Sequence, residues 1–343
     1  MLAEIPGRIL LIQLQQLGDV LLTSPLLEDL RAAFPSARID FLTRIAPASL
    51  LQGNPYPTEV ILYDHARALR MPWLVRSRRY DCVIDAQSSP RSAQVVLASG
   101  AHRRVGWRSG GPWRLVYTDH IRRDEGHAGY VVRDRQRLLG PLNVPVADRR
   151  PRLYLDSAER AQGEAEVRAR NLPAGTPRVG LVLSAGSPPS IWPVERFAAL
   201  ATRLAADGIA PIVLRTRGDE DAVSRCVSMA LGALRMDAPE LRRFLGLLSA
   251  LDVLVCADTG PAHMAMALDV ATVTLYGPTP ANHWNPGLPT TAAVSSPRAS
   301  CPACAAGLRR HAPSHRCMLE IEVDAVYARV RAMLSSAPAR PRT

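Results

Sequence analysis

Short apolar runs recur along the chain, and segments with helical periodicity separate most of them. In the first half, these runs span residues 8–14, 38–43, 59–63, 82–85 and 104–107. Continuous apolar runs of this length are typical of strands buried on both faces of a parallel sheet. Helical patterns between them, as over residues 20–34 and 127–142, complete a strand–helix alternation. The pattern predicts an α/β fold with a parallel sheet covered by helices.

A second series of apolar runs follows a stretch that is rich in proline. Pro141, Pro145 and Pro151 punctuate this stretch, and new runs follow at residues 178–183, 210–214, 253–257 and 272–276. A chain of 343 residues is longer than one typical domain. We therefore expect one α/β domain over residues 1–160 and another over 175–320. A last helix and a frayed tail are expected over 321–343.

The turn after the run 253–257 has the composition of an anion-binding turn. It reads Asp258-Thr259-Gly260-Pro261 and leads into a helix of small residues. Aspartate and threonine can cap a helix, and glycine lets a ligand approach the backbone N–H groups. A second turn with glycine, over 277–279, follows the next strand. Neighbouring strand ends of this kind form one edge of a ligand cleft, although any capped helix in such a fold could show the same pattern.

The first strand also ends in a polar turn, with Gly18 and Asp19 before a helical pattern. From the residues alone, Asp19 either caps this helix or presents a carboxylate at the ligand edge of the sheet. No Gly-x-Gly-x-x-Gly loop follows the first strand, which argues against a nicotinamide-dependent dehydrogenase.

These two turns together resemble the signature of glycosyltransferase family 9, which includes the ADP-heptose:lipopolysaccharide heptosyltransferases. The motifs are 17–25 and 258–268 with 276–279, and the similarity spans about residues 8–334. The resemblance implies a GT-B fold, in which two Rossmann-like domains face a cleft. It also implies a metal-independent, inverting transferase without a cofactor, which moves heptose from ADP-heptose to a lipopolysaccharide core or related surface glycan. The first domain would bind the acceptor and the second the nucleotide-sugar.

The resemblance also assigns residues to the expected site. Asp19 would be the catalytic base, and the acceptor would meet Gln87, Ser88 and Arg91. The donor would meet Ser184, Gly186, Ser187, Glu220, Met236, Asp258, Thr259, Gly260 and His263. Simpler alternatives remain for three of these: a helix amino-terminal acid for Glu220, a core methionine for Met236 and a packed helix residue for His263.

The chain departs from the family pattern at two positions. The family usually has a lysine just before the Trp-Pro pair at 192–193, where this chain has Ser190 and Ile191. The candidates to supply that charge to a phosphate are Arg196, Arg215 and Arg217. The family also often has a basic residue where Gln13 stands.

The cysteines near the end of the chain have more than one interpretation. Cys301, Cys304, His311 and Cys317 have a spacing that would suit zinc. Many family members have a similar cysteine pattern, and ordinary thiols or a disulfide are alternatives. We predict no metal, with these four residues as the alternative ligand set.

The charge of the chain indicates phosphorylated or anionic partners. All 42 basic residues are arginines, and the formal net charge is +11. Arginine matches phosphate oxygens with a planar fork. We expect a nucleotide-sugar donor, a phosphorylated glycolipid acceptor and peripheral contact with an anionic inner membrane. The basic segment 67–79, which contains Trp73, would suit such a contact if its apolar side is not in the core.

The sequence also limits location and partners. No nucleic-acid-binding motif accompanies the arginines, so we expect no nucleic acid. No apolar run reaches membrane-spanning length and no signal-peptide pattern is present, which predicts a cytoplasmic protein. Association with the cytoplasmic face of the inner membrane is compatible with this prediction. Two other classes remain open. These are a sugar-nucleotide-binding or epimerase-like GT-B protein without transferase activity, and an arginine-rich module that binds membranes or nucleic acid.

Overall fold

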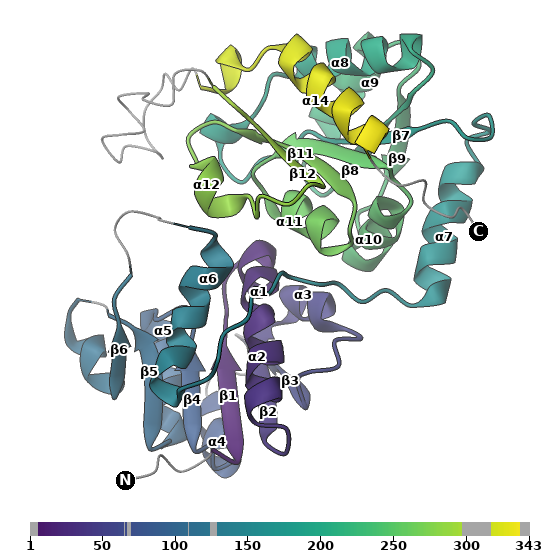
Figure 1. Cartoon of the computed structure of the whole chain (residues 1–343). Coiled ribbons are helices and arrows are strands. Elements are labelled where there is room, and N and C mark those ends of the chain that lie inside the picture. Colours follow the sequence, from purple (N-terminus) through teal and green to yellow (C-terminus); the bar gives the residue numbers. More distant parts are fainter. Residues whose placement is uncertain are drawn as a thin grey trace. The chain divides into compact units, whose positions relative to one another are not determined.

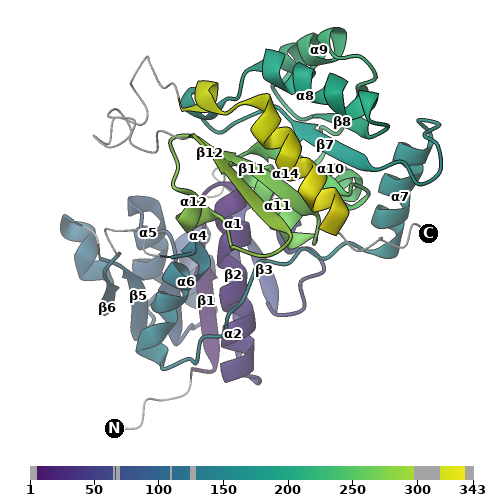
Figure 2. The same ribbon diagram turned by 45° about the horizontal axis from the view of Figure 1, so that its top comes forward.

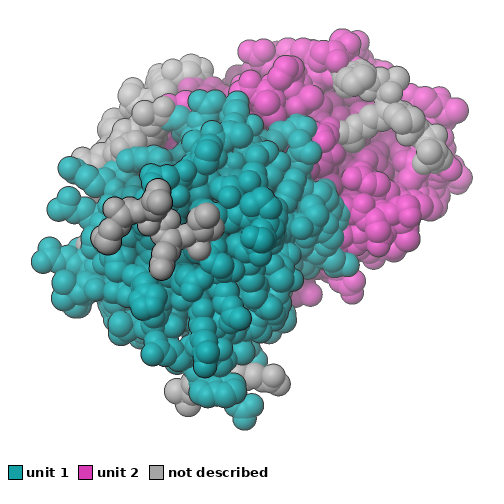
Figure 3. Space-filling view, turned by 60° about the horizontal axis from the view of Figure 1, so that its bottom comes forward, with its two compact units in different colours: residues 1–154 teal, residues 155–343 magenta. Residues whose placement is uncertain are grey.

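The chain folds into two compact units, residues 1–154 and 155–343, which Figure 3 colours separately. The computed structural model describes residues 6–64, 66, 70–108, 110–123, 129–296 and 317–336. Each unit has its own sheet and its own apolar core, and each is described by itself.

The first unit is built on a sheet of six parallel strands (Figure 1). Its strands are β1 (Arg8–Ile12), β2 (Arg38–Arg44), β3 (Glu59–Tyr63), β4 (Cys82–Asp85), β5 (Arg103–Trp107) and β6 (Asp119–Ile121). Their order in the sheet is β3-β2-β1-β4-β5-β6. Because all neighbours are parallel, every strand ends at the same edge. The direction of winding reverses between β1 and β4, which is where ligands bind in open sheets of this kind.

Helices cover both faces of this sheet. One face carries α1 (Leu17–Thr23), α2 (Pro25–Ala33), α6 (Val131–Gln136) and the 3₁₀ helix η4 (Arg137–Leu142), and the other carries α4 (Met71–Ser77), α5 (Pro90–Ser99) and η3 (Pro112–Val116) (Figure 2). The short helices α3 (Ile45–Ala48) and η1 (Ser49–Leu51) follow β2.

Two helix predictions in this unit need correction. The single helix expected over 20–34 is two helices, α1 and α2, which meet at Ser24. Pro25 is the first residue of α2, because proline lacks the N–H that would continue α1. The helix expected over 127–142 is α6 followed by η4, and residues 127–128 lie outside the part of the chain that the structure describes.

The second unit repeats the same sheet architecture. Its strands are β7 (Arg178–Val182), β8 (Ala210–Arg215), β9 (Leu234–Asp237), β10 (Val253–Ala257), β11 (Ala271–Tyr276) and β12 (Thr291–Ser295). They are parallel and lie in the order β12-β11-β10-β7-β8-β9. The winding therefore reverses between β7 and β10, the counterparts of β1 and β4.

Helices also cover both faces of the second sheet. One face carries α8 (Val194–Ala206), α9 (Glu220–Met229) and α14 (Val323–Ser336), and the other carries α10 (Leu241–Ser249) and α11 (Gly260–Ala267) (Figure 1). Helix α7 (Ser157–Arg168) packs on α10, and the shorter elements are η5 (Pro188–Ser190), α12 (Ala281–Trp284) and η6 (Met318–Glu320). None of the described helices is long and apolar enough to cross a membrane.

Candidate active site

Asp19 lies at the winding reversal of the first sheet, in the first turn of the helix that follows β1. Its Oδ1 accepts a hydrogen bond from Nη2 of Arg135 at 2.7 Å. Its Oδ2 accepts none from any residue that the structure describes, and a quarter of the side chain is exposed. One carboxylate oxygen is thus held from the protein side, and the other is open to a ligand.

Arg135 comes from α6 and is almost wholly buried. Its Nη1 donates to the backbone oxygen of Asp19 and, at 2.6 Å, to the hydroxyl of Thr23. Burial lowers the pKa of Arg135, and the Asp19 carboxylate opposes that effect. This residue is not among the site residues predicted from the sequence. The available signal was its position four residues after the buried Val131, on the apolar face of the helix.

Gln87 joins the two loops that flank the winding reversal. Its Oε1 accepts from the backbone N–H of Leu14 at 3.0 Å, and its Nε2 donates to Ser89 Oγ at 2.9 Å. The amide therefore fixes the loop after β4 to the loop after β1, which leads to Asp19.

The same loop is anchored by a buried carboxylate. Asp85 accepts from the backbone N–H groups of Gln87 and Ser88 at 3.0 and 2.9 Å and from the Tyr117 hydroxyl at 2.7 Å. Burial raises the pKa of Asp85, and these hydrogen bonds oppose the rise. The Ser88 hydroxyl is occupied as well, because it accepts from the backbone N–H of Trp107 at 2.8 Å. Of the three residues predicted to meet the acceptor, Gln87 and Ser88 thus make contacts that shape the loop. Arg91 is exposed and makes no hydrogen bond or ion pair with the described residues.

A basic hollow, lined by Arg108, Arg114, Arg122 and Arg123, follows β5 and β6. None of the four pairs with a carboxylate among the described residues. The Arg123 guanidinium lies 5.1 Å from the ring centre of Trp107 and donates to the backbone oxygen of Gln87 at 3.4 Å. Four arginines that lack a carboxylate partner among the described residues can bind an anion with several oxygens.

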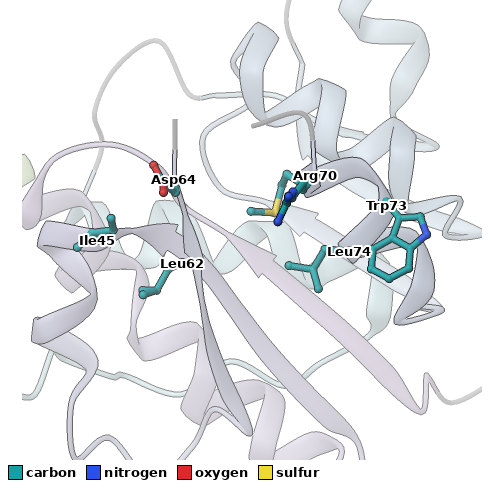
Figure 4. Close-up of a pocket in the computed structure, with 7 residues that line it drawn as sticks. Ile45, Leu62, Asp64, Arg70, Trp73 and Leu74 are labelled. Carbon is teal, nitrogen blue, oxygen red and sulfur yellow. The ribbon is translucent and has the colours of Figure 1, made fainter. Parts of the chain in front are cut away.

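An apolar hollow of about 800 Å³ lies beyond β2 and β3, at the same edge of the sheet (Figure 4). Ile45, Leu62, Met71, Trp73 and Leu74 line it, together with Asp64 and Arg70. Trp73 is 75% exposed, whereas its helix neighbours Met71 and Val75 are in the core. The basic amphipathic segment therefore places one apolar side inward and still exposes a tryptophan.

In the second unit, the turn after β10 lies at the winding reversal. Asp258 is buried, which raises its pKa to about 6, while a hydrogen bond from Thr279 opposes the rise. His263 is buried one turn into α11, with its Nε2 3.7 Å from Oδ1 of Asp258 and its ring 5.9 Å from that of Trp284.

The start of α11 differs from the expected side-chain cap. Thr259 occupies the cap position, but its hydroxyl donates to the backbone oxygen of Ala257 at 3.2 Å and does not cap the helix. The backbone N–H of Gly260 makes no hydrogen bond with any described residue. This end of the helix is therefore open to an anion.

The model of glycosyltransferase family 9 (heptosyltransferase) matches residues 69–312 of the chain. The chain belongs to this family. Lipopolysaccharide heptosyltransferase 1 of Escherichia coli strain K12 is 26% identical over 308 residues, which cover 82% of this chain and 89% of that protein. Two solved structures superpose on nearly the whole chain. One is the family 9 glycosyl transferase from Veillonella parvula DSM 2008, with a TM-score of 0.84, 20% identity and coverage of 96% and 98%. The other is E. coli ADP-heptose lps heptosyltransferase II, with a TM-score of 0.78, 22% identity and coverage of 96% and 98%.

This family 9 protein is accordingly a glycosyltransferase, and its two Rossmann-like units have the GT-B type of fold. The sequence-based predictions of family, fold class and enzyme class are confirmed.

The remaining donor-side predictions fall at the ends of β7, β8 and β9 in the glycosyltransferase. Ser184 lies 3.4 Å from Thr216 through their hydroxyls, and no atom would meet a Cβ at Gly186 within 4 Å. The Ser187 hydroxyl lies 3.3 Å from that of Ser190. Ser184, Gly186 and Ser187 follow β7, the strand that pairs with β10, so they lie beside the Asp258 turn.

Glu220 and Met236 lie further along the same edge of the sheet. Glu220 begins α9 and forms ion pairs with Arg215 at 3.0 Å and Arg235 at 2.5 Å. Met236 is a buried residue of β9.

Of the three arginines that could replace the missing lysine, two pair with carboxylates. Arg196 donates to the backbone oxygen of Ile321 and pairs with Glu322, and Arg215 pairs with Glu220 and Asp237. Arg217 is exposed and donates only to the backbone oxygen of Pro239, at 3.2 Å, among the described residues.

The predicted alternative metal ligands are only partly described. Cys317 is buried, and Cys301, Cys304 and His311 lie outside the described residues. Within residues 6–296 and 317–336, apart from the short gaps noted above, no group of three potential ligands is suited to a metal.

Proposed function

We propose that this glycosyltransferase moves heptose, with inversion, from ADP-heptose to a lipopolysaccharide core or related surface glycan. The observation that carries the proposal is the Asp19 carboxylate, which has one oxygen held by Arg135 and one oxygen open at the ligand edge of the sheet. The names of the similar E. coli proteins, which are lipopolysaccharide heptosyltransferase 1 and ADP-heptose lps heptosyltransferase II, support the choice of sugar and nucleotide.

In the proposed step, the oxygen of an acceptor hydroxyl attacks the anomeric carbon of the heptose. A new carbon–oxygen bond forms as the bond to the diphosphate breaks, and attack from the opposite face inverts the configuration. Asp19 takes the hydroxyl proton as a general base. The nucleoside diphosphate leaves with the electron pair of the broken bond and an additional negative charge.

The second unit supplies groups for that leaving charge. The open N–H of Gly260 and the positive end of the α11 dipole favour a phosphate at this turn. We assign to Arg217 the charge that the family usually takes from a lysine, because it is the least committed of the three candidates. Fixed donors of this kind stabilise developing charge without reorganising during the reaction.

The first unit has features that suit a phosphorylated glycolipid acceptor. The basic hollow adjoins the Gln87 loop and would bind anionic groups of the acceptor. The apolar hollow with exposed Ile45, Leu62 and Trp73 would contact lipid at an anionic inner-membrane surface, on its cytoplasmic side. Both hollows lie at the edge of the sheet where Asp19 lies.

The first test is a thermal-unfolding panel with ADP, UDP, GDP and CDP at equal concentrations. A nucleotide at 100 times its dissociation constant stabilises the native state by about 2.7 kcal/mol. We expect ADP to raise the melting temperature most. A larger shift with another nucleotide would mean that the donor sugar is carried by that nucleotide and not by ADP. No shift with any of the four would argue against nucleotide-sugar binding.

The second test is transfer from ADP-heptose to a heptose-deficient lipopolysaccharide core, with wild type and Asp19→Ala. We expect Asp19→Ala to keep the ADP-induced shift and to lower turnover by about 10²-fold or more, the low end of general-base contributions. Turnover that is unchanged in Asp19→Ala would rule out this residue as the base.

A further inference from the structure

We infer that Arg135 positions the catalytic carboxylate and is needed for full turnover, although it does not itself exchange a proton with the substrate. This inference rests on the proposed role of Asp19 as the base. It assigns a second residue to the reaction. This residue lies 116 positions after Asp19 in the sequence but contacts it in the fold.

Arg135 contacts Asp19 at two points. Nη2 donates to the carboxylate at 2.7 Å, and Nη1 donates to the backbone oxygen of the same residue. A planar guanidinium that contacts both the side chain and the main chain of one residue restricts the side-chain torsions of that residue. The carboxylate is thereby turned so that Oδ1 faces the protein and Oδ2 stays open.

The arginine is itself held in place. Nη1 also donates to the Thr23 hydroxyl at 2.6 Å, and that hydroxyl donates to the backbone oxygen of Asp19 at 2.7 Å. The Gln13 amide lies 3.5 Å from the same hydroxyl. Arg135, Thr23 and Gln13 are all less than a tenth exposed. A support of this kind keeps a reactive group within the narrow geometry that catalysis needs.

Docking of α6 does not depend on this contact alone. The next residue, Gln136, is also buried and donates to Asp29 on α2 at 2.6 Å and to the backbone oxygen of Ala147 at 2.9 Å. Neither of these hydrogen bonds reaches Asp19. Its substitution therefore provides a matched control for loss of a buried polar contact from the same helix.

The test compares Arg135→Met with Gln136→Leu in the sugar-transfer assay. We expect Arg135→Met to lower kcat by about 10- to 100-fold, the effect of a small misplacement of a reacting group, with the dissociation constant for ADP unchanged. Gln136→Leu should lose stability without a comparable loss of kcat. Thr23→Val, which removes the support of Nη1 but keeps the arginine, should lower kcat by a smaller factor.

Two further measurements separate positioning from a general structural role. Added guanidinium ion should restore part of the activity of Arg135→Ala, because it can occupy the vacated space beside Asp19. In an Asp19→Asn background, Arg135→Met should have little additional effect on turnover, since the two residues act as a unit. Equal losses from Arg135→Met in both backgrounds, without guanidinium rescue, would overturn the inference.

A crystal structure of Arg135→Met tests the inference without any turnover. We expect the Asp19 carboxylate to occupy more than one rotamer or to turn away from its present direction. A single, unchanged Asp19 rotamer would overturn the positioning role, and this result does not depend on whether the sugar-transfer assay shows activity. Failure of wild type to transfer heptose would instead count against the proposed function.

Discussion

Replacement of Asp258 by asparagine should make the protein more stable at neutral pH while impairing its function. The carboxylate is buried at the turn before α11, and burial raises its pKa from 3.8 to about 6. Its Oδ1 accepts no hydrogen bond from the described residues, and Nε2 of His263 lies 3.7 Å from it. An ionised carboxylate here costs free energy that a neutral amide of the same shape would not.

The size and the pH dependence of this effect follow from the pKa shift. Because the native pKa is raised, the native state binds a proton more tightly than the unfolded chain does between about pH 4 and pH 6, so stability falls as the pH rises through this window. A shift of two units corresponds to about 3 kcal/mol, fully expressed above about pH 7. At about pH 4.5 most native molecules are protonated at this site, and the difference from asparagine is only about 1 kcal/mol.

Urea unfolding of wild type and Asp258→Asn at about pH 4.5 and 7.5 measures both values. The gain in the free energy of unfolding should rise from about 1 to about 3 kcal/mol between these pH values. Asp221→Asn, at an exposed position on α9, serves as a control and should change stability by less than about 0.5 kcal/mol at either pH. A gain that does not depend on pH, or a loss at neutral pH, would refute the reasoning. We also expect Asp258→Asn to reduce sugar transfer, since a buried carboxylate that destabilises the fold at a site often trades stability for function.

Three further predictions concern the first unit. A Cβ at Gly106 would collide with the ring of Tyr117, so Gly106→Ala should lower the free energy of unfolding in urea by about 1–3 kcal/mol. Gly140→Ala, where a Cβ meets nothing within 4 Å, should cost less, and equal losses would contradict the packing argument. Trp73→Ser should weaken co-sedimentation with phosphatidylglycerol vesicles while the ADP-induced thermal shift stays the same; undiminished co-sedimentation would exclude this surface. Arg114→Gln should lower kcat/KM for a phosphorylated acceptor by about tenfold, by raising KM, and leave the KM for the donor unchanged. If only the KM for the donor changed, the hollow would not be an acceptor site.

The sequence predicted every inner strand of both sheets, because burial on both faces leaves mostly apolar residues, and it also predicted the edge strand β3. Strands β6, β9 and β12 were missed. All three are edge strands with partly exposed residues, and β6 has only three residues. The break between α1 and α2 was readable in principle from Pro25, which cannot continue a helix.

The candidate site was predictable where it depends on strand ends and less so where it depends on distant contacts. Asp19 and Asp258 follow β1 and β10, and both turns could be located from the pattern alone. Arg135 could not, because its contact with Asp19 depends on how α6 packs after more than a hundred intervening residues. The loop-shaping contacts of Gln87 likewise join segments that the sequence cannot bring together.

The long separation between Asp19 and Arg135 also bears on the synthesis of the protein. The two residues are 116 positions apart, so the arginine leaves the ribosome on the order of ten seconds after the aspartate at ordinary elongation rates. During that interval, the nascent chain can form its first strands, but it lacks the group that orients the carboxylate. A stalled or truncated chain that ends before α6 would therefore contain Asp19 without an aligned base. The carboxylate would be oriented only once α6 has emerged and docked, and sugar transfer would also need the second unit, which follows α6 in the chain.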